Sequence, residues 1–469
     1  MGWASVLSIP SPSACVSSPP LRVTDVARLQ DWQGRLDQDA RRRGVQADRL
    51  IALWAGAVLV LMLLYICIGP NPYQHEILVD PLTGGAEASP VNRLVWLGLL
   101  GLSAPLLWFR RQALPAMMLK LLPLLLLFAW FALTTRWALD PAVSTRRLIL
   151  YAINLLICVG VAVGLGDSRR LHLAMATGCA VLVGMDILSW IAAPGVSMTP
   201  LGLAAIHSHK NTLGAVMLLA GFVCGTYAWS RTDWRARAFW WGVTVLALVL
   251  LVASLSKTSM GLFAALACAT PVIVSLMAQR RMVRWGLIAV AALMVAGVVF
   301  GWLAYCLVIG ADPWAPFAGI TFTQRTEVWA FVWDEFVKRP IQGWGFGSFW
   351  DINPTVQPSL QTDAWFAQPD AYTNEAHNGF LDLAVTTGLI GLTGAVIVLM
   401  RWIFGGLILI RDAVGGDRGR LGAAILLGVF PLMVFGHNFM ESSYFTANSI
   451  FGTVLLLLGV EIERRFIRA

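Results

Sequence analysis

The chain has 469 residues, of which 58% are hydrophobic and 13% are charged. A soluble globular domain carries about 25% charged residues, so this composition excludes an ordinary soluble protein and favours an integral membrane protein. The net charge of +8 does not indicate a nucleic-acid partner, because the arginines fall in short clusters between apolar runs, where they set topology.

The first 48 residues are predicted to form a cytoplasmic N-terminal segment. Its opening part, SIPSPSACVSSPP, is of low complexity, and we expect it to be disordered. Residues 21–43 follow with apolar side chains at roughly helical spacing, which predicts a short helix.

Residues 49–462 contain apolar runs that recur along almost the whole length. Each run of about 20 residues is long enough to cross ~30 Å of hydrocarbon. They predict an all-α, polytopic integral membrane domain with about 12 transmembrane helices. The predicted spans are 50–69, 94–109, 114–134, 148–166, 171–192, 212–229, 238–255, 260–278, 286–309, 378–400, 421–436 and 445–461.

Arginine clusters occupy every second loop between these spans. Positive charge gathers on the cytoplasmic side of membrane proteins, so the alternation predicts an even number of spans with both termini cytoplasmic. The tail, residues 463–469, is then cytoplasmic as well.

One long loop, residues 310–376, lies on the opposite face under this topology. Its segment TQRTEVWAFVWDEFVKRP predicts a short surface helix that ends at Pro340, and GWGFGSFW predicts a glycine-rich turn. Long loops in compact proteins are usually either functional or disordered. We therefore look for a site on this face.

Polar side chains gather at the outer ends of several predicted spans. Charges beside hydrocarbon are costly unless paired or wet, so such a group predicts a site. Fixed cations suit an anion such as a diphosphate, and a histidine suits proton transfer near neutral pH. The residues are His207, His209, Lys210, Lys257, Arg325, Glu375, His377, Asn378, His437, Glu441, Arg136, Arg146 and Arg147.

Each of these residues also has a simpler interpretation. Lys257 and Arg325 could be snorkelling anchors at the membrane surface, and His377 could cap its helix. His207 and His209 form an HxH pair, but spacing fixes no third ligand, so no metal site is predicted. The combination of cations with a histidine on one face favours a site.

Several segments resemble the O-antigen ligase and polysaccharide polymerase superfamily. HNGFLDLAVTTGLIGL has its pattern of His-Asn, nine residues and Gly-x-x-Gly, and FTQRTEVWAFVWDEFVKRPIQGWGFGSFW resembles the loop before it. IHSHKNTLG resembles the His-Lys-Asn-x-Leu-Gly motif of the exopolysaccharide polymerase branch, the succinoglycan type. With WALDPAVSTRR and MESSYFTANS, the resemblance runs from about residue 128 to residue 450.

The resemblance implies a metal-independent, inverting glycosyltransferase of the bacterial inner membrane that uses no cofactor and works at the periplasmic face. Its donor is a glycan on undecaprenyl diphosphate. By motif, His377 is the implied general base, and Arg325 and Lys210 would hold the diphosphate, although ligases tend to have arginine at the position of Lys210. Lys257 is added as a third cation from its location. Asn378, Arg147 and Glu441 complete the expected substrate-binding set.

Polymerisation of lipid-linked repeat units is the predicted function, because of the motif at 207–214. A second lipid diphosphate would also need countercharges, which Arg146, Arg147 and Lys257 would supply. The alternative is a ligase that transfers the glycan to lipid A core. A transporter or lipid-glycan flippase is the alternative from another class, disfavoured because the polar residues gather at one face instead of the midplane.

Partners expected for the polymerase are the lipid-linked donor, a lipid-linked acceptor and membrane lipids. Chain-length regulators and flippases are further expected partners, and nucleic acid is not. The assignment requires a cavity at the outer face that is ringed by His377, Arg325 and Lys210, because one sugar–phosphate linkage must touch the base and the cations together.

Overall fold

The structure is a computed structural model that describes residues 23–74, 89–313, 325–368, 371–446 and 449–466, with the backbone alone for 23–43. Residues 1–50 and 51–469 form two compact units. The expected all-α class is confirmed, since the described elements are helices apart from one antiparallel hairpin of Met198–Thr199 (β1) and Gly202–Leu203 (β2). The low-complexity opening up to residue 22 lies outside the described residues.

Helices fill the first half of the chain with short connections. The helix expected over residues 21–43 continues without a break into the first predicted span. The elements are α1 (Val23–Ile68), α2 (Pro90–Phe109), η1 (Arg111–Ala113), α3 (Leu114–Lys120), α4 (Leu122–Thr134), η2 (Thr135–Trp137), α5 (Pro141–Leu165), α6 (Ser168–Ala192) and α7 (Pro194–Ser197).

The second half repeats this pattern, with one long connection before α13. Two short 3₁₀ turns lie in that connection. The elements are α8 (Lys210–Ser230), α9 (Trp234–Ala253), α10 (Lys257–Ala278), α11 (Arg281–Ile309), α12 (Arg325–Lys338), η4 (Pro358–Gln361), η5 (Trp365–Ala367), α13 (Gly379–Ala413), α14 (Arg418–His437) and α15 (Ile450–Phe466).

The described residues contain nearly as many candidate membrane-spanning helices as the twelve or so predicted. Ten described helices are long and apolar enough to cross a membrane, or eleven if one bent pair is a single span. That pair is the third predicted span, and it bends by 76° between Lys120 and Leu122. Pro123 explains the break, because its ring clashes with the carbonyl four residues earlier and it has no N–H to donate. The twelfth predicted span falls on α15, whose 17 residues are short for a full crossing.

Aspartates begin many of the helices. Asp140, Asp167, Asp233 and Asp417 each accept a backbone N–H in the first turn of α5, α6, α9 and α14. A carboxylate suits this place, since it satisfies a free N–H and complements the helix dipole. These short polar caps let consecutive spans turn back within a few residues.

A kink divides α13 and receives the glycine-rich turn. Gly388 has φ +67° and ψ −174°, which interrupts the helix and frees backbone groups around it. The turn uses them: Leu389 N–H donates to Pro340 O, Trp344 N–H to Val385 O and Gly345 N–H to Thr386 O, at 2.8–2.9 Å. The loop is therefore built into the membrane domain at a defined position.

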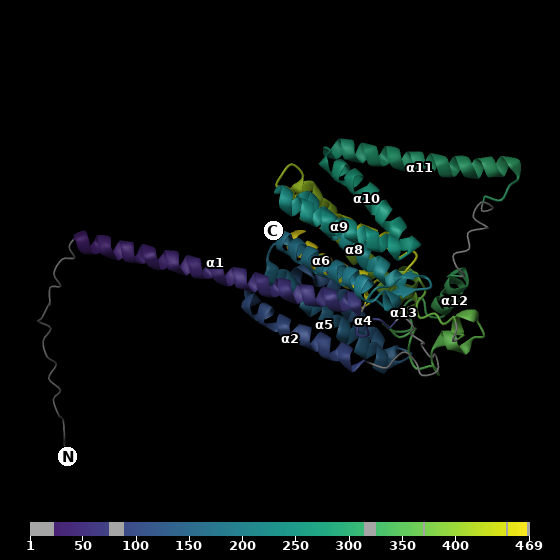
Figure 1. Ribbon diagram of the computed structural model, residues 1–469. Coiled ribbons are helices and arrows are strands. Elements are labelled where there is room, and N and C mark those ends of the chain that lie inside the picture. The colour runs from purple at the N-terminus through teal and green to yellow at the C-terminus, as the bar shows by residue number, and fades with distance from the viewer. Residues whose placement is uncertain (1–22, 75–88, 314–324, 369–370, 447–448, 467–469) are drawn as a thin grey trace, which may run out of the picture. The chain divides into compact units, whose positions relative to one another are not determined.

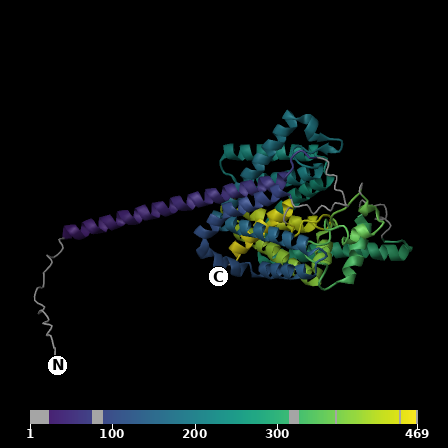
Figure 2. The same cartoon turned by 90° about the horizontal axis from the view of Figure 1, so that it is seen from below.

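The long connection packs over the start of α13. The surface helix expected before Pro340 is α12, which ends at Lys338, and apolar side chains on it meet the loop and α13. Figures 1 and 2 show α12 and the loop after it, in green, at one end of the helices of residues 51–469. The shared cluster contains Val328, Val332, Phe336, Phe349, Trp350, Phe366, Ala376, Ala384 and Val385.

Candidate active site

His377 is held in an unusual backbone conformation immediately before α13. Its φ is +49°, in the left-handed region that residues other than glycine rarely adopt. Asn378 follows it and caps α13, with its side-chain oxygen accepting the N–H groups of Phe380 and Leu381. Such strain persists only where the surroundings over-determine it, and it is common at functional sites.

The imidazole ring lies between two carboxylates. His377 Nδ1 is 2.7 Å from Glu375 Oε1 and 3.2 Å from Glu441 Oε2. Both contacts use Nδ1, and within the described part of the chain no contact engages Nε2. About 30% of the side chain is exposed, so Nε2 is the ring atom that can meet a substrate.

Arg325 joins this group from the first turn of α12. Its Nη2 lies 3.0 Å from Glu441 Oε1, and its Nη1 donates to the carbonyl of Met440. Arg325, Glu441, His377 and Glu375 therefore form one continuous chain of ionisable groups, drawn from three parts of the sequence. We call these four residues the His377 cluster.

The charges of the His377 cluster reinforce one another. Burial by itself lowers the pKa of His377, but hydrogen bonds and negative charge from Glu375 and Glu441 outweigh it and raise the pKa to about 9. Burial by itself raises the pKa of Glu441, yet His377 and Arg325 lower it to about 2. Both shifts favour a charged imidazolium–carboxylate pair at neutral pH.

Lys210 and Lys257 lie at the starts of two neighbouring helices. The first turns of α8 and α10 touch, since a Cβ on Gly214 would come within 2.6 Å of the Ser256 side chain. Lys210 Nζ donates to Leu201 O at 3.2 Å, and Lys257 is exposed. Among the described contacts, neither lysine touches the His377 cluster.

Arg147 is bonded to the glycine-rich turn. Its Nη1 donates to the carbonyls of Gly347 (2.7 Å) and Trp350 (2.8 Å), and its Nη2 donates to the carbonyl of Asp351 (3.0 Å). These bonds occupy the guanidinium and fasten the end of the glycine-rich turn to α5. The geometry thus makes Arg147 a support of the loop, and its substrate contact stays a prediction.

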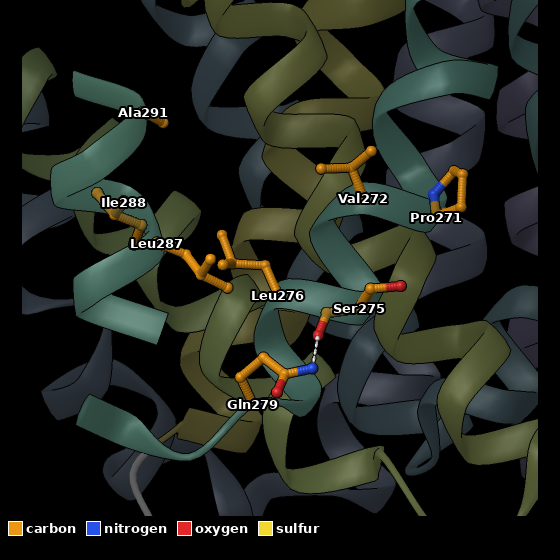
Figure 3. A pocket seen from close by; sticks show the side chains of 8 residues that line it. All are labelled: Pro271, Val272, Ser275, Leu276, Gln279, Leu287, Ile288 and Ala291. Carbon is orange, nitrogen blue, oxygen red and sulfur yellow. Dashed lines mark hydrogen bonds between the residues drawn. The ribbon is translucent and has the colours of Figure 1, made fainter. Parts of the chain in front are cut away.

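The expected cavity around His377, Arg325 and Lys210 is not among the hollows that the structure describes. One hollow of about 600 Å³ lies between α10 and α11, and Figure 3 shows its mostly apolar lining, with Gln279 Nε2 donating to Ser275 O. A second lies between α1 and α2, beside Tyr65. Among the described contacts, Arg325 is joined to His377 through Glu441, and Lys210 has no contact with either residue.

The sequence was compared with models of known protein families. Residues 242–396 match the family model described as O-antigen ligase. This part of the chain is similar to the O-antigen ligase family. The superfamily resemblance is thereby confirmed, and the match includes Lys257, Arg325, His377 and Asn378. No curated protein matches the chain.

The HxH pair outside the matched residues does not form a common site. His207 is fully buried, with Nδ1 2.8 Å from Cys67 O and Nε2 3.1 Å from Asp186 Oδ2. His209 is exposed and caps α8 by accepting the N–H of Asn211. The two rings thus meet different surroundings, and burial together with Lys210 lowers the pKa of His209.

Glu375, His377 and Glu441 are the one group in the described ranges whose spacing would suit a metal ion. Each offers one ligand atom, and these atoms lie within 4.8 Å of one another. A metal at Nδ1 would have to replace the hydrogen bonds that this nitrogen makes with Glu375 and Glu441. Arg325 already supplies a positive charge to Glu441. The cluster is therefore better suited to holding a proton.

Two residues of this site were not among the predicted site residues. Glu375 was noted beside His377 but given no role, and Asp382 was not singled out. The signal for Asp382 was available, because a carboxylate inside an otherwise apolar segment is unusual. Its partners, described below, come from distant parts of the chain and could not be inferred from spacing.

Proposed function

We propose that this protein transfers a glycan from a polyprenyl diphosphate to a sugar hydroxyl at the outer face of the membrane, by metal-independent inverting transfer. The observation that carries the proposal is the His377 ring, whose Nδ1 is held by two carboxylates while no described contact engages Nε2. In its neutral form, a ring fixed in this way can accept a proton at Nε2.

The proposed reaction needs one base and one anion-binding group. The acceptor oxygen forms a bond to the anomeric carbon as its proton moves to His377 Nε2. The bond from that carbon to the diphosphate oxygen breaks, and its electron pair leaves with the diphosphate. Arg325 would stabilise this departing charge, since guanidinium groups bind phosphate oxygens in pairs.

The acceptor that we propose is a second lipid-linked repeat unit, so that the protein is a polymerase of a surface or exopolysaccharide. Support comes from the motif at 207–214 and from the neighbouring positions of Lys210 and Lys257, which offer a second place for a diphosphate. Arg147 also bonds loop carbonyls, so the support drawn here comes from the two lysines. A ligase acting on lipid A core is the second candidate, favoured by the description of the matched family.

The acceptor is tested by supplying purified protein in vesicles with the undecaprenyl-diphosphate-linked repeat unit alone. A polymerase yields a ladder of longer chains that each carry one lipid. Transfer that begins only after lipid A core is added identifies a ligase. Movement of the lipid-linked glycan across the vesicle membrane without any transfer product overturns the proposal in favour of a flippase.

The separate roles of base and anion-binding group predict different effects of two substitutions. His377→Ala should lower turnover by about 10²–10⁴-fold and leave donor binding nearly unchanged, because a base acts on the acceptor proton. Arg325→Ala should weaken donor binding and turnover together. Arg280→Ala, at an exposed arginine before α11, is the control. Equal loss of donor binding in the two variants contradicts this division of roles.

The proposed setting is the bacterial inner membrane, with both termini in the cytoplasm and the His377 cluster on the periplasmic side. Chain-length regulators and the flippase that delivers the donor are the proposed protein partners. These proposals rest on the ligase-family match and on the alternation of arginines along the chain.

A further inference from the structure

We infer that Asp382 is a positioning residue that holds His377 and Glu441 in register for proton transfer. The inference rests on the proposed function of His377 and deepens it. Asp382 lies in the first turn of α13 and does not touch the His377 ring in any described contact.

The carboxylate of Asp382 joins three segments of the chain. Both of its oxygens accept the N–H of Ala376, at 3.2 and 3.1 Å. Oδ1 also accepts the indole N–H of Trp350 at 2.8 Å, and Oδ2 accepts the hydroxyl of Ser442. The glycine-rich turn, the segment of His377 and the last outer turn therefore meet at this one side chain.

These contacts flank the two residues of the proposed proton-transfer pair. Ala376 directly precedes His377, and Ser442 directly follows Glu441. Ser442 Oγ donates to Asp382 and accepts the N–H of Asn378 at 3.1 Å, which uses the hydroxyl both as donor and as acceptor. The N–H groups on both sides of His377 are thus anchored, which explains how its left-handed φ is maintained.

A neutral amide cannot replace this carboxylate. Asp382 accepts from an indole, a backbone N–H and a hydroxyl, and it uses both oxygens to do so. Asparagine has the same shape but one oxygen, and its NH₂ group would face a donor. Asp382→Asn must therefore lose at least one of the three links without changing the size of the side chain.

Several charged groups other than Asp382 lie near His377. Glu375 and Glu441 contact the ring, and Arg325 of α12 reaches it through Glu441. His437, at the end of α14, lies within electrostatic reach of Glu441 and Arg325. Substituting Asp382 leaves all of these groups in the protein and changes how they are placed.

The test compares Asp382→Asn with Thr386→Val in the full-length protein in vesicles. Thr386 is one turn further along α13 and its hydroxyl donates to the backbone carbonyl of Asp382, not to the carboxylate. We expect Asp382→Asn to lower kcat by about 10–100-fold, because small displacements of a base are costly, with donor binding within about twofold. Thr386→Val should change neither quantity.

A second readout does not depend on activity. The rate at which diethyl pyrocarbonate modifies His377 at each pH, followed by mass spectrometry, gives the titration midpoint of that ring. Asp382→Asn should move the midpoint down toward the ordinary value near 6.5, since Glu375 and Glu441 lose their fixed contacts. Ser442→Ala removes the hydroxyl that links Asp382 to the N–H of Asn378 but leaves the bonds of Asp382 to Ala376 and Trp350, so it should move the midpoint in the same direction by less.

The outcomes separate this inference from the proposed function. An unchanged midpoint in both Asp382→Asn and Ser442→Ala overturns the positioning role, whatever the activity. If Asp382→Asn does not fold, Ser442→Ala decides by the same measurement. A shifted midpoint together with full activity in His377→Ala supports the positioning role but overturns His377 as the base.

Discussion

His377 combines a left-handed backbone with a ring that is held by two carboxylates. Backbone strain of this kind costs about 1–3 kcal/mol, so the neighbouring hydrogen bonds must offset it. The arrangement also leaves the ring protonated at neutral pH, because the pKa of His377 is raised to about 9. A base that starts protonated must lose this proton before each transfer.

The pH dependence of turnover follows from this raised pKa. Neutral His377 becomes more abundant as pH rises, so turnover should increase up to about pH 9 and then level off. The contribution of His377 to the free energy of unfolding has the opposite trend. It is complete below the unfolded-state pKa of about 6.5 and is lost as pH rises through about 9. Turnover rates and thermal unfolding temperatures, measured from pH 6 to pH 10, check these two trends.

Glu441→Gln should move the rising limb to lower pH. The substitution removes one negative charge and one charged hydrogen-bond partner from the ring, so the pKa of His377 falls. The control is Glu327→Gln, at an exposed carboxylate of α12 that bonds Trp365 and not His377. A rising limb at the same pH in Glu441→Gln and in the unsubstituted protein would show that the limb belongs to another group.

Removal of metal ions should leave the rate unchanged. The carboxylate of Glu441 is already paired with Arg325 and with His377 Nδ1, which a metal would have to displace. Activity measured after dialysis against excess chelator, with metal content determined on the same sample, checks this. Strong loss of activity that one added metal restores would instead make Glu375, His377 and Glu441 a metal site.

Helix α13 shows how one element sets the position of the site. Its start carries Asn378 as the cap, and its kink at Gly388 receives the backbone of the glycine-rich turn. The same turn is fastened to α5 by Arg147. The loop that surrounds the His377 cluster is therefore fixed at both sides by membrane helices instead of moving freely above them.

Gly388→Ala should destabilise the protein and disturb the loop. A Cβ at this position would collide with the carbonyl of Ile341, and alanine disfavours the observed φ of +67°. We expect a loss of about 1–3 kcal/mol in the free energy of unfolding, seen as a lower unfolding temperature in detergent. Gly98→Ala in α2, where a Cβ meets nothing within 4 Å, should not lower it. Equal unfolding temperatures would contradict the role of Gly388.

At the scale of the whole molecule, charged groups gather at the end opposite to the His377 cluster. Arg401 of α13 pairs with Glu463 at 2.8 Å, Arg465 pairs with Asp167 at 3.1 Å, and Arg464 pairs with Glu461 at 2.7 Å. The first two pairs join the end of α15 to α13 and to the start of α6, and the third lies within α15. Short as it is, α15 is thereby tied to neighbouring spans at this end.

This arrangement predicts the topology of the protein. The arginine-rich end should face the cytoplasm, because positive charge is retained there. A fluorescent protein fused to the C-terminus should be fluorescent, and alkaline phosphatase inserted at the exposed Thr355 should be active, since each reporter works on one side of the membrane. The reverse result at either position would mean that a crossing has been counted wrongly.

Local sequence features predicted much of the fold. Apolar run length placed a helix at every predicted span, since the need to satisfy backbone groups in lipid acts on each segment by itself. The surface helix before Pro340 was predicted in the same way, from the inability of proline to continue a helix. The bend before Pro123 was missed, although proline causes it too, because apolar composition concealed the break.

The same distinction between local patterns and long-range packing applies to the candidate site. The sequence by itself determined that His377, Asn378 and Arg325 stand in family motifs on one face, because those patterns are local. Only the tertiary structure decided that Glu441 holds the His377 ring from 64 residues away, that Arg147 serves the loop some 200 residues later, and that Asp382 joins three segments. Hydrogen-bond partners at such separations are set by how helices pack, and packing depends on the whole chain at once.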